Sequence, residues 1–498
     1  MNTHSNKTIS ILLLLAGSLL VGFSAGRWLA PLAAWVGPVL IMRYTRDHQA
    51  GRGFILVLSA YILAFLIGFG DMWASSWGYL AMSGLAVLYA LLWSLPYLAD
   101  RLMFARLKGF SSTFIYPLAA VTLEFLNMRT NPVGAWGATG FTQYGNLPIM
   151  QLASLTGMIG ITFLMGWFAS VANWAWENRE RGNTIARGLT AFAVVLAGVY
   201  IFGVLRLNLT LPRDTEETVR VAGITAEGQL AVYEKVGGFA NWKMQSETGR
   251  QAVHSHWDLY FEETVREAQA GAKIVVWPEI AGLTYSSEVA SLIARAQDVA
   301  AQNGIYLAVP LAVFPPPDSD QPYENTLLLI DPSGAIVLEH VKYGGALLEG
   351  NRLVGNGTLQ TVDTPFGVLS GVICWDMDYP TIIQQAGQKG TGLMLVPSFD
   401  YFEIDPVHTY MAVFSAIANG MSLVRQVDMN LSIAVDPYGR VLAQTDYFGA
   451  ADRTMVAQVP VKHVTTVHNV FGHYFEWVCL IGFLSVVVRA IVIRRQDN

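Results

Sequence analysis

Apolar residues follow two different patterns along this 498-residue chain, and the first is a set of long runs with few charges. These runs occupy residues 9–26, 28–42, 53–70, 74–97, 112–126, 150–176, 187–207 and 475–493. Most reach the roughly 17–25 residues that a helix needs to cross a hydrocarbon core, although 28–42 and 112–126 do so only with their flanks. The pattern predicts a seven-helix membrane domain over residues 1–210, and an eighth membrane helix with a cytoplasmic tail over 474–498.

Between residues 211 and 473 the pattern changes, and short β-branched runs alternate with amphipathic segments. Buried strands are predicted at residues 219–227, 272–279, 304–314, 367–374, 392–398 and 421–428. Helices that end at or near glycine are predicted at residues 256–271, 287–304 and 408–420. This alternation is typical of an α/β sheet covered by helices.

Two segments of the polar block repeat one motif. Residues 325–338 and 430–442 each contain Asn, then Asp-Pro six residues later, then any residue and Gly. Each segment reads as strand, tight turn, strand. The repeat fits two independent hairpins, and it also fits a duplicated α/β half that pairs with its twin to give two stacked sheets.

The composition narrows the class of protein. Hydrophobic residues make up 53% of the chain and charged residues only 14%, which is unusual for a single soluble domain and favours a membrane protein. The net charge of −6 and the lack of a long basic run argue against nucleic acid as a partner.

Basic residues in the short loops indicate how the chain is oriented. They crowd alternate connections, at Arg43, Arg46, Arg52, Arg101, Arg106, Lys108, Arg179, Arg181, Arg187, Arg494 and Arg495. Because such residues favour the cytoplasmic side, we expect both chain ends in the cytoplasm and residues 211–473 on the outer side. Cys374 lies in that exported block and Cys479 in the last membrane helix, so we expect no disulfide between them and a free thiol at Cys374.

Three polar side chains follow three predicted strands of the exported block. Cys374 ends an apolar run before a proline-containing turn and a predicted helix, where helix amides favour a thiolate. Glu279 follows a hydrophobic strand, and in an apolar setting such a carboxylate can act as a general base. Lys342 ends the second strand of a hairpin, where an ammonium can stabilise an oxyanion.

Each of these residues also has a purely structural interpretation. Cys374 could be a packed core residue, Glu279 a solvated carboxylate at a strand end, and Lys342 an exposed lysine on an edge strand. The strand ends of α/β sheets are, however, where such proteins gather their functional side chains. We therefore expect the three residues to lie close together.

The motifs around these residues resemble a known group of enzymes. "WPE" (277–279), a hairpin that ends in "VK" (341–342) and "VICWD" (372–376), in this order, resemble the nitrilase superfamily. This resemblance implies an αββα sandwich in which Glu279 is the base, Lys342 stabilises the oxyanion and Cys374 is the nucleophile. The membrane helices, together with "YPLAAVTLEFLN" (116–127) and "NPVGAWGATGFTQYGN" (131–146), resemble more narrowly the bacterial apolipoprotein N-acyltransferase family.

The resemblance also assigns supporting residues. Glu349 matches a further glutamate of both groups, which could orient Lys342 or contact an incoming amine, or could be a simple loop carboxylate. Trp375 and Asp376 stand where the acyltransferases usually have Tyr and Glu. Trp242 and Tyr285 are candidate lipid or substrate contacts, and so is the loop 399–406, although aromatic side chains of this kind also serve as interfacial anchors.

Metal binding is not predicted. His463, His468 and His473 recur every five residues, which matches neither a helix face nor a strand face. We therefore expect no metal, and the resemblance implies no cofactor.

The implied activity is acyl transfer in the bacterial inner membrane, with the catalytic domain on the periplasmic side. A phospholipid gives its acyl chain to Cys374 as a thioester, and the N-terminal diacylglyceryl-cysteine of a lipoprotein then accepts it. We expect the protein to act as a monomer. A membrane-tethered amidase or nitrilase, which passes the same thioester to water, is the alternative, and a non-catalytic scaffold is a third interpretation.

Overall fold

The computed structural model describes residues 3–74, 78–107, 109–209, 217–236, 246–347 and 349–496. The predictions for Lys108 and Trp242 fall outside these residues. The chain forms two compact units. One comprises Met1–Arg129, Gly137–Thr210 and His473–Asn498, and the other comprises Thr130–Trp136 and Leu211–Gly472.

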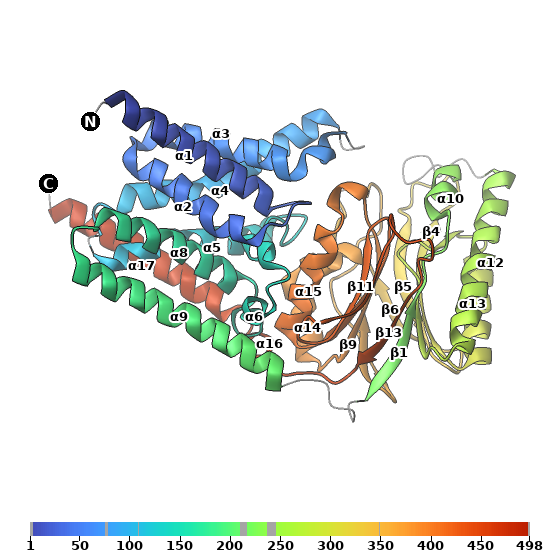
Figure 1. The fold of residues 1–498 in the computed structure, drawn as a ribbon. Helices are drawn as coiled ribbons and strands as arrows, with labels where there is room; N and C mark the ends of the chain where they lie inside the picture. The colour runs from blue at the N-terminus through green and yellow to red at the C-terminus, as the bar shows by residue number, and fades with distance from the viewer. Residues whose placement is uncertain are drawn as a thin grey trace. The chain divides into compact units, whose positions relative to one another are not determined.

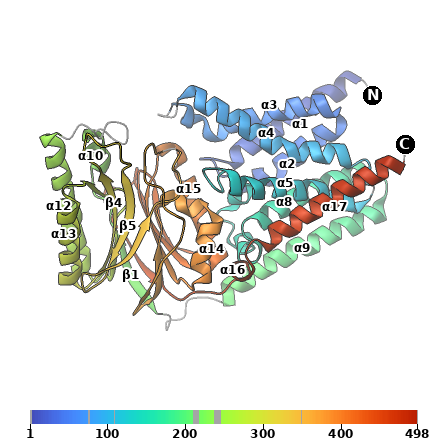
Figure 2. The same cartoon turned by 180° about the vertical axis from the view of Figure 1, so that it is seen from behind.

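The first unit consists of apolar helices, drawn from blue to green in Figure 1, with the last one in red. These are α1 (Thr3–Ser24), α2 (Pro31–Asp47), α3 (Ala50–Phe69), α4 (Tyr79–Met103), α5 (Ile115–Thr130), α6 (Leu147–Met150), α7 (Ala153–Thr156), α8 (Ile159–Glu177), α9 (Gly182–Leu209) and α17 (Tyr474–Gln496). Every apolar run of the sequence overlaps one of these helices. Figure 2 shows the helices from behind.

Length and composition qualify four described stretches as membrane spans. They are Ala50–Met72, Tyr79–Met103, Gly182–Leu209 and Tyr474–Ile493. A fifth span results if Leu147–Thr156 and Ile159–Glu177, which meet at a bend of 115°, cross together. The apolar part of α1 is shorter, and α2 and α5 contain only 17 and 16 residues. A count of seven spans before the exported block therefore stays a prediction.

A buried ion pair ties three helices of this unit together. Arg46 of α2 donates two hydrogen bonds to the carboxylate of Asp100 of α4, at 2.7 and 2.8 Å. Glu177 at the end of α8 lies 3.4 Å from the same guanidinium. Both side chains of the Arg46–Asp100 pair are almost fully buried. Because charges in an apolar environment are costly unless they are paired, this contact stabilises the packing of α2 on α4.

The second unit contains two β-sheets. The first has the order β13-β1-β2-β4-β5-β6, with β3 paired to β4, and the second has the order β12-β11-β10-β9-β8-β7. The strands of the first sheet are β1 (Thr218–Gly223), β2 (Ile274–Val276), β3 (Gly282–Tyr285), β4 (Tyr306–Phe314), β5 (Glu324–Ile330), β6 (Ile336–Val341) and β13 (Met455–Pro460). Those of the second are β7 (Thr361–Thr364), β8 (Gly367–Gly371), β9 (Leu393–Phe399), β10 (Ser422–Asp428), β11 (Leu431–Val435) and β12 (Val441–Asp446).

The two sheets share one connectivity. In the first sheet β1, β2 and β4 run parallel, and β5 and β6 follow as an antiparallel hairpin. In the second sheet β8, β9 and β10 run parallel, and β11 and β12 follow in the same way. The two Asp-Pro hairpins thus occupy the same place in both sheets. This arrangement is what a duplicated α/β half predicts.

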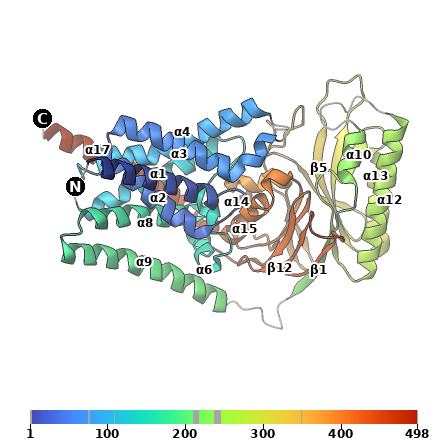
Figure 3. The same cartoon turned by 45° about the horizontal axis from the view of Figure 1, so that its top comes forward.

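Helices cover the sheets on their outer faces. In Figure 3, α10 (Gln229–Lys235), α12 (Glu247–Gln269) and α13 (Val289–Asn303) lie against the first sheet, whereas α14 (Pro380–Gln388) and α15 (Val407–Asn419) lie against the second. The short helix α16 (Val467–Phe471) follows β13. The side chains of α12, α13 and the first sheet form one hydrophobic core, with Trp277 and Tyr260 near its centre. The predicted αββα sandwich is therefore confirmed.

Candidate active site

The three predicted catalytic residues all lie just beyond the ends of strands. Glu279 comes three residues after β2, Lys342 directly after β6, and Cys374 three residues after β8. The first two therefore follow strands of one sheet and the third follows a strand of the other. All three side chains are buried, so the interpretations of Glu279 as solvated and of Lys342 as exposed do not apply.

Glu279 and Lys342 are in direct contact. The ammonium of Lys342 donates a hydrogen bond of 2.5 Å to Oε1 of Glu279 and a second hydrogen bond to Oε1 of Glu349. Asn325, at the start of the first hairpin, donates to the same Glu279 oxygen at 2.7 Å. The other oxygen, Oε2, accepts the backbone N–H of Phe399 at 2.9 Å. Glu279 is thus held at both oxygens.

Burial and the neighbouring opposite charges have opposing effects on the pKa values of Lys342 and Glu349. Burial alone would lower the pKa of Lys342, but the carboxylates of Glu279 and Glu349 outweigh it and raise that pKa well above its usual value. Burial raises the pKa of Glu349, against the opposing effect of Lys342 and Arg352. The guanidinium of Arg352 lies 2.6 Å from Oε2 of Glu349 and also donates to the backbone carbonyl of Gly344 at 2.7 Å. Lys342 therefore stays charged, and Glu349 orients it.

Cys374 begins a 3-10 helix, Cys374–Asp378, in a left-handed backbone conformation with φ of 49°. Side chains other than glycine and asparagine rarely adopt this conformation, which costs of order 1–3 kcal/mol and is common at functional sites. Its sulfur lies 3.6 Å from the carbonyl oxygen of Phe399 and 3.5 Å from Oδ1 of Asp400. Phe399 therefore contacts both Glu279, through its N–H, and Cys374, through its carbonyl.

The ionisation of Cys374 differs from the sequence-based prediction. Burial, together with the carboxylates of Glu279 and Asp400, raises the pKa of the thiol well above its usual value, and Lys342 and Arg425 offset this effect only in part. The predicted help from helix amides is missing because the 3-10 turn separates Cys374 from the start of α14 at Pro380. The resting group is a thiol.

Asp376 fixes the turn that follows Lys342. Its Oδ1 accepts the backbone N–H groups of Tyr343 and Gly344 at 3.0 and 2.6 Å. Its Oδ2 contacts Nε2 of His340 at 2.8 Å and accepts the N–H of Ile373 at 3.1 Å. Asp376 thus joins the backbone next to Lys342 to the backbone next to Cys374. These contacts fix the backbone on both sides of the site.

We expect Asp376→Ala to destabilise the second unit by about 3–5 kcal/mol, because it leaves a buried histidine and three buried N–H groups without their partner. Thermal unfolding followed by tryptophan fluorescence measures the change. Asp363→Ala, at an exposed position of β7, is the matched control and should change stability by less than about 0.5 kcal/mol. Equal unfolding temperatures for the two variants would contradict the assigned role.

The candidate substrate contacts differ in how far they are exposed to solvent. Tyr285 is fully buried in the core on β3, with the guanidinium of Arg250 4.8 Å from the centre of its ring. A lipid could contact Tyr285 only if that part of the core opened. In the loop 399–406, Phe402 is exposed and packs against exposed Phe448, with ring centres 5.1 Å apart. Among the aromatic candidates within the described residues, Phe402 is therefore the exposed one, whereas Tyr401 is half-buried and Phe399 is buried.

Four charged residues near Cys374 were not predicted from the sequence. Asp378, Asp400, His408 and Arg425 are all buried, and they contact one another. Arg425 lies in the middle of β10, within a run predicted to be buried. A charged residue in a buried strand requires a partner, and this requirement was the available signal.

Among the described residues, three side chains of types that can bind a metal lie close together at this network of charges. Ligand atoms of Cys374, Asp400 and His408 all lie within 4.8 Å of one another. However, the guanidinium of Arg425 contacts Asp400 and His408 at 3.0 Å, and both ring nitrogens of His408 contact carboxylates. A permanent cation already occupies this position, so the group fits an ion network better than a metal site.

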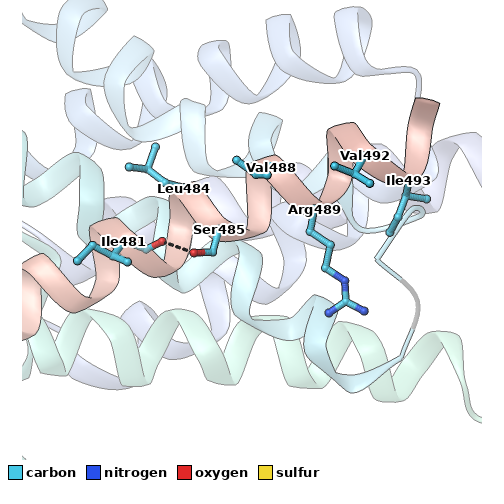
Figure 4. A pocket seen from close by; sticks show the side chains of 7 residues that line it. All are labelled: Ile481, Leu484, Ser485, Val488, Arg489, Val492 and Ile493. Carbon is cyan, nitrogen blue, oxygen red and sulfur yellow. Dashed lines mark hydrogen bonds between the residues drawn. The ribbon is translucent and has the colours of Figure 1, made fainter. Parts of the chain in front are cut away.

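A surface hollow of about 690 Å³ lies along α17 and is unrelated to these residues. Figure 4 shows its apolar lining, which includes Ile481, Leu484 and Val488, with Arg489 as its charged residue. A face of this composition on a membrane helix is suited to contact with lipid chains.

The cluster of Glu279, Lys342 and Cys374 at strand ends, and the two sheets that share one connectivity, define a carbon-nitrogen hydrolase domain. Residues 240–469 match the carbon-nitrogen hydrolase family. Residues 16–171 match a second family, the apolipoprotein N-acyltransferase N-terminal domain. The chain belongs to the apolipoprotein N-acyltransferase family and is a multi-pass membrane protein.

Two apolipoprotein N-acyltransferases are similar to this chain over most of its length. The apolipoprotein N-acyltransferase of Geobacter metallireducens is 24% identical over 98% of this chain and 96% of its own length. That of Agrobacterium fabrum is 24% identical over 90% of this chain and 89% of its own length. Among solved structures, an amidase from Nesterenkonia sp. is similar with a TM-score of 0.40 and 17% identity, covering 52% of this chain and 94% of the amidase.

Proposed function

We propose that the protein transfers a fatty acyl chain from a phospholipid to the N-terminal diacylglyceryl-cysteine of a lipoprotein. In the first half, Glu279 takes the proton of the Cys374 thiol while the sulfur attacks the ester carbonyl. Lys342 stabilises the oxyanion of the tetrahedral intermediate. The ester C–O bond then breaks, Glu279 returns the proton to the leaving oxygen, and a lysophospholipid departs from the thioester.

The second half uses the same groups. The α-amino group of the lipoprotein attacks the thioester carbonyl and gives a proton to Glu279. The C–S bond breaks, the sulfur regains a proton, and the N-acylated lipoprotein leaves. Because the resting sulfur is a thiol with a raised pKa, deprotonation accompanies attack in this scheme, which makes Glu279 necessary in both halves.

The observation that carries this proposal is the contact of one lysine with two carboxylates beside a strained cysteine. An ammonium has three N–H bonds, and the described partners of Lys342 use two of them. The third is left to donate to an oxyanion. Phe399 keeps the base and the sulfur in a fixed relation because it contacts both.

The membrane helices support lipids as substrates. Moving an acyl chain out of a bilayer costs about 0.8 kcal/mol for each CH₂ group, so an enzyme anchored beside the chain avoids that cost. The distribution of arginine and lysine among the loops supports a catalytic unit on the periplasmic side of the bacterial inner membrane. Since one chain supplies Glu279, Lys342 and Cys374, a monomer suffices for the reaction.

The test uses purified protein in vesicles with a phospholipid that carries a labelled acyl chain, and a synthetic diacylglyceryl lipopeptide with a free N-terminus. We expect labelled N-acyl lipopeptide, with lysophospholipid formed in equal amount. The same lipopeptide with an acetylated N-terminus is the control and should remain unlabelled. Labelled free fatty acid without N-acyl lipopeptide would instead identify a hydrolase and refute the proposal.

A further inference from the structure

A second group of buried charges contacts Cys374, and the proposed reaction does not use it. Oδ1 of Asp400 lies 3.5 Å from the sulfur, and a guanidinium nitrogen of Arg425 lies 3.5 Å from the backbone carbonyl oxygen of Cys374. Asp400 follows β9 directly, whereas Arg425 belongs to the neighbouring strand β10. Both side chains have no exposed surface. A carboxylate placed so close to a nucleophilic sulfur calls for a physical explanation.

Asp400 is held as a carboxylate by two cations. It contacts Nδ1 of His408 at 2.7 Å, and it accepts hydrogen bonds from Arg425 at 3.0 and 3.3 Å. Burial alone would raise the pKa of Asp400, but these two partners lower it well below its usual range. Asp400 therefore carries a negative charge next to the sulfur at neutral pH.

His408 lies between two carboxylates. Nδ1 contacts Asp400 and Nε2 contacts Oδ2 of Asp378, both at 2.7 Å. Only the imidazolium form donates from both nitrogens at once. Burial and Arg425 oppose this form, but Asp400 and Asp378 outweigh them and raise the pKa of His408. The four side chains thus carry two negative and two positive charges.

Two tryptophan rings pack against His408. The rings of Trp375 and Trp136 lie 4.7 and 5.6 Å from its imidazole ring, measured between ring centres. The carbonyl oxygen of Asp378 accepts the backbone N–H of Ala135 at 2.7 Å, which fixes the segment that carries Trp136. Because all four charged side chains are buried, their charges act on one another with less of the screening that solvent provides.

The charged and titratable groups around the sulfur can be named. They are Glu279, Lys342, Asp400, His408 and Arg425, with Tyr401 as a further titratable neighbour. Glu279 and Lys342 take part in the proposed reaction. Asp400 is the remaining anion, and its contact with the sulfur makes the thiolate less favourable than the thiol.

We propose that Asp400 is a positioning residue, which accepts the thiol proton of Cys374 as a hydrogen bond and keeps the sulfur protonated until substrate arrives, and that His408 is the counter-cation that offsets part of the charge of Asp400 at the sulfur. The inference rests on the proposed function only in taking Cys374 as the nucleophile. Such a contact keeps Cys374 from reacting with other electrophiles between turnovers. With Asp378 and Arg425 included, the positive and negative charges of the four side chains are equal in number.

The test measures how fast iodoacetamide alkylates Cys374 as a function of pH, by intact-mass analysis of the full-length protein. The maximal rate reports access to the sulfur, and the pH of half-maximal rate reports its ionisation. For Asp400→Asn we expect that midpoint to fall by about one pH unit or more, since a neighbouring anion is removed. For His408→Gln we expect it to rise by about half a unit, since a cation is removed. Asp363→Asn should leave the midpoint unchanged, and Cys374→Ser gives the background from Cys479.

Opposite shifts in Asp400→Asn and His408→Gln support the proposal, because packing defects alone would move both midpoints in one direction or neither. Shifts in the same direction, or no shift in folded Asp400→Asn protein, overturn it. If Asp400→Asn does not fold, His408→Gln decides alone, and an unchanged or lowered midpoint overturns the proposal. Alkylation needs no acyl donor, so opposite shifts in a protein that forms no acyl adduct would refute the proposed function and leave this inference standing.

Discussion

Protein carrying Cys374→Ala should gain no acyl mass when it is incubated with phospholipid, whereas the parent protein should gain one acyl group that hydroxylamine removes. The reason is that the thioester needs the sulfur that starts the 3-10 helix Cys374–Asp378, and alanine has no nucleophile. Transfer to a lipopeptide should fall to background in the same variant. Intact-mass analysis before and after hydroxylamine measures the adduct directly.

Cys479→Ala is the matched control for this experiment. Cys479 is the other cysteine of the chain, and it is buried on α17. This variant should form the adduct at the parent rate. A hydroxylamine-labile adduct on Cys374→Ala, or its loss from Cys479→Ala, would show that Cys374 is not the acylated residue.

Lys342→Met should slow formation of the adduct by about 10²–10³-fold, because the donor to the oxyanion is lost. The substitution also leaves Glu279 and Glu349 buried without the ammonium that separates them, which costs about 3–5 kcal/mol of stability. Single-turnover measurement of the adduct gives the rate, and thermal unfolding gives the stability. Both values should change together, since one ammonium serves both purposes.

Lys273→Met provides the comparison for Lys342→Met. Lys273 belongs to the same unit and is exposed, so its substitution should change neither rate nor stability by more than the measurement error. If folded Lys342→Met protein formed the adduct at the parent rate, Lys342 would not be the oxyanion donor.

Much of the fold could be predicted because its main elements repeat strong local patterns. The strands β1, β2, β4, β8, β9 and β10 lie in short runs rich in buried apolar residues, and each was predicted from such a run. The strands β3, β7 and β13 were not. They have only four to six residues, β7 is partly exposed, and β13 joins the sheet through β1, which lies far away in the sequence. Such strands are defined by their partners rather than by their own sequence.

The candidate site likewise contains some residues that could be predicted from the sequence and others that could not. Glu279, Lys342 and Cys374 follow strands with clear patterns, so their proximity could be predicted. The ion network could not, because Asp378 and His408 meet across 30 residues and Asp400 and Arg425 across 25. The ionisation of Cys374 differs from the sequence-based expectation for the same reason, since the pKa of its thiol depends on burial, on Glu279 and on Asp400 rather than on the neighbouring helix.

The Arg46–Asp100 pair bears on how the protein is assembled in the cell. Arg46 lies in the last turn of α2 and Asp100 near the end of α4, so the pair joins the ends of the two helices that are predicted to face the cytoplasm. The carboxylate belongs to α4, which the ribosome makes later. We therefore expect α2 to acquire its final packing only after α4 has been made, when the guanidinium of Arg46 gains its partner.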